Sequence, residues 1–184
     1  MGFHTYDPER APNLEDASRY RYCSAEELLA LFDQGGVVAD LGSGTGFYTD
    51  DVAPYVETCY AVDVQHEMHD FYREKGVPES VELVEAAVDD LPFPDGHLDG
   101  AFSTMTYHEF HSDEALAELH RTLAPDARVG IADWTANGDG GEGPPLDERF
   151  MLDDCTSAFE AAGFSVEFAS ERRETFVCSL RREP

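Results

Sequence analysis

The fold is decided by residues 37–46, VVADLGSGTG, in a chain of 184 residues. The first five form a short apolar run, which is typical of a buried parallel strand. The glycines that follow permit a tight turn and let a ligand approach the backbone closely. Because a strand followed by such a turn and a helix opens many α/β sheets, ligand binding is expected at the carboxyl end of this strand.

Strands and helices are predicted to alternate on both sides of this stretch. Ser24 caps a helix that ends at Gly35-Gly36, and Ser112 caps another in which Leu116, Leu119 and Leu123 share one face. Further helices are expected at 65–75 and 151–162, and strands at 37–41, 58–63, 81–86, 98–104, 128–134, 164–169 and 174–180. The last two strands leave no room for a helix between them. The predicted fold class is therefore α/β, a three-layer, Rossmann-like, doubly wound sheet of seven strands with the last strand antiparallel.

The charge of the chain excludes several classes of partner. There are 39 acidic residues against 12 lysines and arginines, which gives a formal net charge of −27. Such a surface repels nucleic-acid phosphates and anionic lipid head groups, so neither a nucleic acid nor a membrane is expected as a partner. No stretch approaches the roughly 18 to 20 apolar residues of a membrane span, and residues 1–10 lack a signal-peptide pattern. A cytoplasmic protein is predicted.

The scarcity of lysine beside so many acidic residues indicates a solvent of high salt concentration. Lys75 is the only lysine, and the other basic residues are arginines. This composition resembles that of proteins from salt-loving archaea, and we predict a halophilic protein. In molar salt the Debye length falls to about 3 Å, so repulsion between the acidic side chains is screened. A melting temperature that does not rise between dilute buffer and molar KCl would contradict this.

The cysteines do not form a metal or disulfide pattern. Cys23, Cys59, Cys155 and Cys178 lie far apart, without a Cys-x-x-Cys pair. Neither a zinc knuckle nor a disulfide scaffold is indicated, and buried free thiols are expected.

The spacing of the glycines narrows the ligand of the turn. Gly42, Gly44 and Gly46 form a Gly-x-Gly-x-Gly pattern, whereas the dinucleotide fingerprint has Gly-x-Gly-x-x-Gly and the P-loop has Gly-Lys-Ser/Thr. Asp63 closes the second strand, where a carboxylate can accept both hydroxyls of a ribose. Together with Asp40, it favours a cationic ligand without phosphates.

Four ordered motifs carry a resemblance to a known family. They are VVADLGSGTG, CYAVDVQHEM, DDLPFPDGHLDGAFSTMTYHEF and LHRTLAPDARVGIADW. Residues 37–134 thus resemble a class I S-adenosylmethionine-dependent methyltransferase. The segment GPPLDER, followed by a helix ending in AAGF, resembles the type 11, ubiquinone/menaquinone-biosynthesis branch. The resemblance implies an S-adenosylmethionine-binding domain at 37–184, with an N-terminal helical segment at 1–36 that covers the substrate side of one compact unit.

The resemblance also implies a cofactor site. Asp40 would orient the loop and help to hold the methionine amino group, and Asp63 would hold the ribose hydroxyls. Ser103 would offer its backbone carbonyl to the amino group. The implied cofactor-binding residues are Asp40, Gly42, Ser43, Gly44, Gly46, Asp63, Val64, Met68, Ala87, Val88, Asp89 and Ser103.

The adenine loop departs from the family pattern. Ala87-Val88 stands where relatives often have Asp-Ala, and the carboxylates are displaced to Asp89 and Asp90. The partner of the adenine amino group is therefore either Asp89 or no side chain at all, with the Val88 backbone as a further contact. Val64 and Met68 would lie against adenine.

Histidines supply the candidate catalytic group. His108 lies just past the fourth strand, where the family often has histidine, and its ordinary pKa near 6.5 suits proton removal. His66 and His69, like His108 and His111, have a spacing that metal sites use, but two ligands do not make a site and no metal is expected. Instead, we expect His66 to pack beside adenine and His69 to be exposed.

The predicted function is transfer of a methyl group from S-adenosyl-L-methionine to a small-molecule acceptor by in-line displacement. The acceptor atom is left open, and a homodimer is allowed. Two alternatives remain at this point. One is a regulatory module that binds the cofactor without turnover, and the other is an NAD-dependent oxidoreductase, which the glycine spacing disfavours.

Overall fold

A single seven-stranded sheet forms the centre of the computed structural model, which describes residues 6–184. The strands are β1 (Val37–Leu41), β2 (Thr58–Asp63), β3 (Val81–Glu85), β4 (Leu98–Thr104), β5 (Leu123–Trp134), β6 (Phe164–Glu171) and β7 (Thr175–Arg182). Their order across the sheet is β3-β2-β1-β4-β5-β7-β6. The first five strands are parallel, and β7 runs antiparallel to both β5 and β6. This architecture confirms the predicted fold class.

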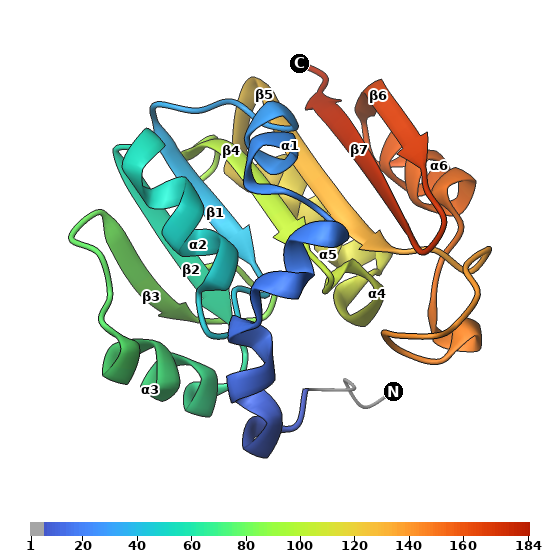
Figure 1. Cartoon of the computed structure of the whole chain (residues 1–184). Helices are drawn as coiled ribbons and strands as arrows, with labels where there is room; N and C mark the ends of the chain where they lie inside the picture. Colours follow the sequence, from blue (N-terminus) through green and yellow to red (C-terminus); the bar gives the residue numbers. More distant parts are fainter. Residues whose placement is uncertain (1–5) are drawn as a thin grey trace.

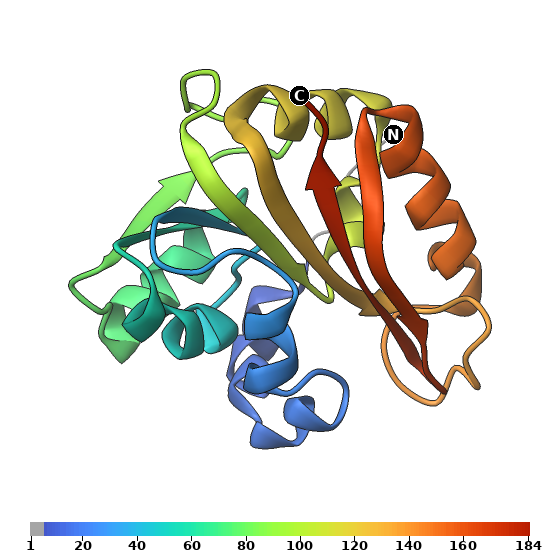
Figure 2. The same ribbon diagram turned by 90° about the horizontal axis from the view of Figure 1, so that it is seen from above.

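Helices cover both faces of the sheet, as Figure 2 shows from above. One face carries α1 (Ala25–Ala30), α2 (Phe47–Val52) and α3 (His66–Lys75), and the other α4 (Tyr107–Phe110), α5 (Asp113–Thr122) and α6 (Leu152–Ala161). The 3₁₀ helices are η1 (Pro8–Glu15), η2 (Ala17–Arg21), η3 (Ala53–Tyr55) and η4 (Leu146–Glu148). The three layers follow from strands that are apolar on both faces and helices that are apolar on one.

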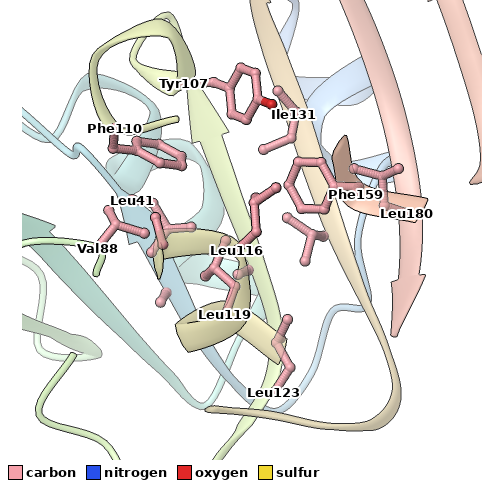
Figure 3. Close-up of a cluster of buried hydrophobic side chains, with 14 of the residues drawn as sticks. Leu41, Val88, Tyr107, Phe110, Leu116, Leu119, Leu123, Ile131, Phe159 and Leu180 are labelled. Carbon is pink, nitrogen blue, oxygen red and sulfur yellow. The ribbon is translucent and has the colours of Figure 1, made fainter. Parts of the chain in front are cut away.

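The α5 helix illustrates how sequence signals become packing. Ser112 begins it by accepting a hydrogen bond from the Ala115 N–H through its hydroxyl oxygen. Leu116 and Leu119, three residues apart, are both buried against the sheet, as Figure 3 shows. Burying each such side chain stabilises the fold by about 1.5–3 kcal/mol, which makes this face the anchor of the helix.

Two predicted helix ends were wrong. The α1 helix was expected to end at Gly35-Gly36, but it ends at Ala30. The α5 helix was expected to run through Leu123 and the fifth strand to begin at Arg128, but β5 begins at Leu123. Leu123 pairs with Leu98 on β4, and the register then shifts before Arg128 pairs with Gly100. Pro125 and the left-handed Asp126 (φ 66°) hide the strand from a pattern search, because both are turn residues.

Two segments lie beyond the carboxyl ends of the parallel strands, as Figure 1 shows: the η1–η2 segment and the loop between β5 and α6. Arg149 fixes this loop from inside. Its guanidinium is fully buried and donates to the carbonyl oxygens of Pro144, at 2.9 Å, and Thr135, at 3.3 Å.

Between residues 6 and 184, no helix combines the length and the apolar character that a membrane crossing requires.

Candidate functional site

A cavity of about 700 Å³ opens at the carboxyl ends of the parallel strands. Its walls come from the glycine loop, from residues that follow β2, β3, β4 and β5, and from the two segments beyond the strand ends. Eight of the predicted site residues line it: Gly42, Ser43, Gly44, Asp63, Val64, Met68, Val88 and His108. Asp40, Gly46, Ala87, Asp89 and Ser103 stand outside the lining.

The glycine loop is shaped by positions that exclude a side chain. Gly42 and Gly46 have φ values of +77° and +80°, in the region that L-residues rarely adopt. A Cβ atom on Gly42 would lie 2.2 Å from Thr106, and one on Gly46 would lie 2.1 Å from the ring of Tyr72. The loop is held by the Gly42 and Ser43 N–H groups, which both donate to Val62 O at 2.9 Å. It is therefore a rigid cradle rather than an ordinary turn.

Asp63 is fixed by main-chain donors at the rim of this cradle. Its Oδ2 accepts a hydrogen bond from the Gly44 N–H, and its Oδ1 accepts one from the Gln65 N–H, both at 2.8 Å. Burial raises the pKa of Asp63. Since each carboxylate oxygen retains acceptor capacity, the group can receive hydroxyl donors from the cavity.

Asp40 lies behind the loop instead of in the cavity wall. Its side chain is 1% exposed, and its Oδ2 accepts a hydrogen bond from the Thr49 hydroxyl at 2.6 Å, while its Oδ1 has no partner among the described residues. Burial, together with the charge of Asp63, raises the pKa of Asp40 to about 7. A nearby cation would stabilise the ionised form of this buried carboxyl group.

Apolar residues line the cavity next to Asp63. They are Val64, Met68, Ala86 and Val88. Asp89, one candidate partner for the adenine amino group, is exposed and lies outside the cavity lining. Ser103 is buried below the loop and donates through its hydroxyl to Leu41 O at 2.8 Å, so its side chain braces β1.

The other end of the cavity is built on the one-turn helix α4. Tyr107 and Phe110, three residues apart, are buried in the core, as Figure 3 shows. His108 and Glu109 lie between them and line the cavity. The two anchoring rings thus direct the intervening histidine and carboxylate to the site.

Asp133, at the end of β5, holds His108 in place. The backbone N–H of His108 donates to Asp133 Oδ2 at 2.7 Å, and Nδ1 of the ring lies 3.0 Å from both carboxylate oxygens. Burial lowers the pKa of His108, but the hydrogen bond to Asp133 and the attraction to Asp133, Glu109 and Glu148 together outweigh burial, so the net pKa is raised. Burial raises the pKa of Glu109, whose Oε1 lies 3.9 Å from His108 Nε2, to about 7.

Sequence reasoning missed Asp133 and Glu148. Asp133 is an acidic residue near the end of an otherwise apolar strand, and it is 1% exposed, a combination that signals a buried polar contact. Glu148 carries no comparable signal, because it lies in a polar loop and reaches the cavity only through the path of that loop.

The remaining histidines differ from expectation. His66 is exposed and hydrogen-bonded to Glu85 at 2.9 Å, whereas His69 is 1% exposed. The expected packing of His66 and exposure of His69 were therefore wrong, because α3 turns His69 towards the sheet. Between residues 6 and 184, no three His, Cys, Asp or Glu side chains gather into a group that could hold a metal ion. All four cysteines are free and buried, as predicted.

A sheet of this order, with a glycine loop after β1 and a carboxylate that closes β2, is the fold of the class I S-adenosylmethionine-dependent methyltransferases. Residues 39–131, half of the chain, match the family described as "Methyltransferase domain". The chain belongs to this family, whose cofactor is S-adenosylmethionine. Membership of this family rules out the alternative of an NAD-dependent oxidoreductase.

Individual relatives agree with this assignment. The chain is 37% identical over 117 residues to the uncharacterised methyltransferase YcgJ of Bacillus subtilis. This match covers 60% of this chain and 44% of YcgJ. It is 30% identical over 112 residues to the ubiquinone/menaquinone biosynthesis C-methyltransferase UbiE of Ectopseudomonas mendocina. That match covers 56% of this chain and 44% of UbiE. The chain spans less than half the length of these curated relatives.

A solved structure covers nearly the whole chain. A crystal structure of an S-adenosylmethionine-dependent methyltransferase from Aquifex aeolicus superimposes with a TM-score of 0.86 and 29% identity. The superposition covers 96% of this chain and 99% of that chain. The fold assignment therefore extends beyond the residues that match the family.

Proposed function

We propose that the protein transfers a methyl group from S-adenosylmethionine to a small-molecule acceptor by in-line displacement. The observation that carries the proposal is the pairing of His108 with Asp133 in the same cavity as the glycine loop and Asp63. One end of the cavity offers a cradle for a cofactor, and the other offers a proton acceptor. A site that only stores the cofactor has no need of the second feature.

The residues present fit the cofactor of the family. Ser43 lines the cavity, and its buried hydroxyl oxygen has no partner among the described residues. Gly42 lets the main chain come close, because Thr106 fills the space that a side chain would take. Asp63 would hold the ribose hydroxyls, Val64 and Met68 would lie against adenine, and Asp40 would stabilise a cationic group through the loop.

When bound, S-adenosylmethionine supplies a methyl group on a sulfonium, which is already a good electrophile. The protein must therefore hold the acceptor in line and accept its proton where the acceptor carries one. His108 is suited to this task because Asp133 engages its Nδ1, which leaves Nε2 as the free proton acceptor. Asp133 would then stabilise the charged imidazolium.

We propose that the N-terminal segment covers the site. Arg19 and Tyr22 of this segment and Pro144 of the loop after β5 all line the cavity. A cover made of two short segments leaves room for a small acceptor rather than a folded protein. The first five residues of the segment predicted at 1–36 lie outside the described residues.

The test is methyl transfer from labelled S-adenosylmethionine in molar KCl, with a panel of small metabolites as acceptors. Label in any acceptor that depends on His108 supports the proposal. Binding of the cofactor without label transfer to any acceptor would favour the regulatory module instead. Failure to bind the cofactor at all would contradict both functions.

A further inference from the structure

The pairing of the cations singles out two arginines in the cavity. Nine of the twelve lysines and arginines form a salt bridge with a carboxylate within residues 6–184. The other three are Arg10, Arg19 and Arg182, and two of these, Arg10 and Arg19, line the cavity. In a chain with 39 acidic residues, a cation without a carboxylate partner is available to an anionic group of a ligand.

Arg19 is held in a fixed position beside the glycine loop. Its Nη1 donates to Leu14 O at 2.7 Å, and its Cζ lies 5.0 Å from the ring centre of Phe47 and 5.2 Å from that of Tyr48. Phe47 and Tyr48 directly follow Gly46, the last glycine of the loop. The guanidinium has five N–H donors, and within residues 6–184 only Nη1 has a hydrogen-bond acceptor.

Arg10 belongs to a different part of the wall. Its Cζ lies 5.6 Å from the ring centre of Tyr6, and Tyr6 O accepts a hydrogen bond from Gln65 Nε2 at 2.9 Å. Gln65 is two residues beyond Asp63, so Arg10 stands on the side where the adenosine is expected. Arg10 is also exposed, whereas Arg19 is half-buried. Both arginines line the cavity but lie in different parts of its wall, so Arg10 can serve as a control for Arg19.

We propose that Arg19 binds the carboxylate of the cofactor's methionine moiety, an inference that rests on the proposed function. The methionine carboxylate is the one anionic group of S-adenosylmethionine. A planar guanidinium with free donors recognises a carboxylate by geometry as well as charge. Stacking on Phe47 and Tyr48 fixes the plane of the guanidinium before the cofactor arrives, so little side-chain entropy is lost on binding.

The experiment compares two nucleosides that differ in the group Arg19 would bind. S-adenosylhomocysteine carries the amino-acid moiety, whereas 5′-methylthioadenosine lacks it. Calorimetric titration in molar KCl gives both affinities for the wild type and for R19Q, R19K and R10Q. We expect R19Q to weaken S-adenosylhomocysteine binding by roughly 10- to 100-fold and 5′-methylthioadenosine binding by less than about twofold. R19K should retain part of the lost affinity.

The ratio of the two affinities separates the outcomes. R10Q should keep the wild-type ratio, because Arg10 lies beside the adenosine end. Equal losses for both nucleosides in R19Q and R19K would overturn the inference, since the arginine would then be acting on the shape of the cavity. No loss in R19Q would overturn it as well. A wild type that binds neither nucleoside would instead overturn the proposed function.

Discussion

The two ends of the cavity are built from different parts of the chain. The end at the glycine loop, where we propose that the cofactor binds (the cofactor end), is made mainly of backbone: the Gly42 and Ser43 N–H groups anchor the loop on Val62 O, and the Gly44 N–H orients Asp63. The end at His108, where we propose that the methyl acceptor binds (the acceptor end), is made of side chains on α4, β5 and the loop that follows β5. It holds His108, whose Nδ1 lies 3.0 Å from Asp133 Oδ1 and whose Nε2 lies 3.9 Å from Glu109 Oε1. A backbone cradle tolerates few substitutions, whereas a side-chain cluster can be altered one group at a time.

This difference separates binding from chemistry. The cofactor end presents a shape that is set by positive φ angles, so it suits a ligand that does not vary. Carboxyl groups with raised pKa values occur at both ends, but the acceptor end adds His108, an imidazole held by the buried Asp133, which is an arrangement suited to proton transfer. Substitutions at the two ends should therefore affect different measurable quantities.

Removing the proton acceptor should give the largest effect. For H108A we expect kcat to fall by about 10²- to 10⁴-fold, the usual contribution of general acid–base catalysis, with the acceptor that the labelled screen identifies. Affinity for S-adenosylhomocysteine should stay within about twofold of the wild type, because His108 belongs to the acceptor end. Rates are measured by single-turnover transfer and affinities by calorimetry. A kcat within about threefold of the wild type would mean that the acceptor end works by positioning alone.

Removing the carboxylate at the cofactor end should change binding instead. For D63A we expect the affinity for S-adenosylhomocysteine to fall by about 10- to 100-fold, since hydrogen bonds to a charged group contribute about 1.5–3 kcal/mol. D63N retains the shape of the side chain and separates the loss of charge from the loss of the contact with the Gly44 N–H. D70A, at an exposed position on α3, is the control and should bind normally. Equal affinity for S-adenosylhomocysteine in D63A and D70A would mean that the Asp63 carboxylate does not contribute to binding at the cofactor end.

The pH dependence should report the His108–Asp133 pair. His108 must be neutral to accept a proton, and its pKa is raised, so kcat/KM should fall about tenfold per pH unit below a midpoint above 6.5. The charged groups that face it are Asp133, Glu109 and Glu148. In D133N the largest raising influence on the pKa of His108 is lost, so the midpoint should move to lower pH. If D133N leaves the midpoint unchanged, the titrating group is not His108, and Glu109 becomes the next candidate.

The sequence predicted one end of the cavity better than the other for a physical reason. The glycine loop and Asp63 are local features, each decided within a few residues of a strand end, and Gly42, Ser43, Gly44 and Asp63 line the cavity. The pairing of His108 with Asp133 joins residues 25 apart in the sequence. It depends on β4 and β5 lying side by side, which no short pattern records.

The elements follow the same rule. Strand β1 was found because a short, largely apolar run next to glycines indicates a buried parallel strand. The α4 helix has a single turn, from Tyr107 to Phe110, and one turn is too short to show a helical period. Its presence follows from the burial of its two aromatic rings, a tertiary effect. The loop that contributes Glu148 was likewise predictable as a loop but not as a wall of the cavity.

The smallest expected effect concerns the displaced carboxylates of the adenine loop. Asp89 is exposed and outside the cavity lining, whereas Val88 is 6% exposed and lines it. We therefore expect D89A to change the affinity for 5′-methylthioadenosine by less than about twofold, because removing a solvated carboxylate costs little. Calorimetry of D89A beside D70A provides the comparison. A tenfold loss specific to D89A would mean that this carboxylate reaches the adenine amino group, and the cofactor end would then depend on a side chain as well as on its backbone.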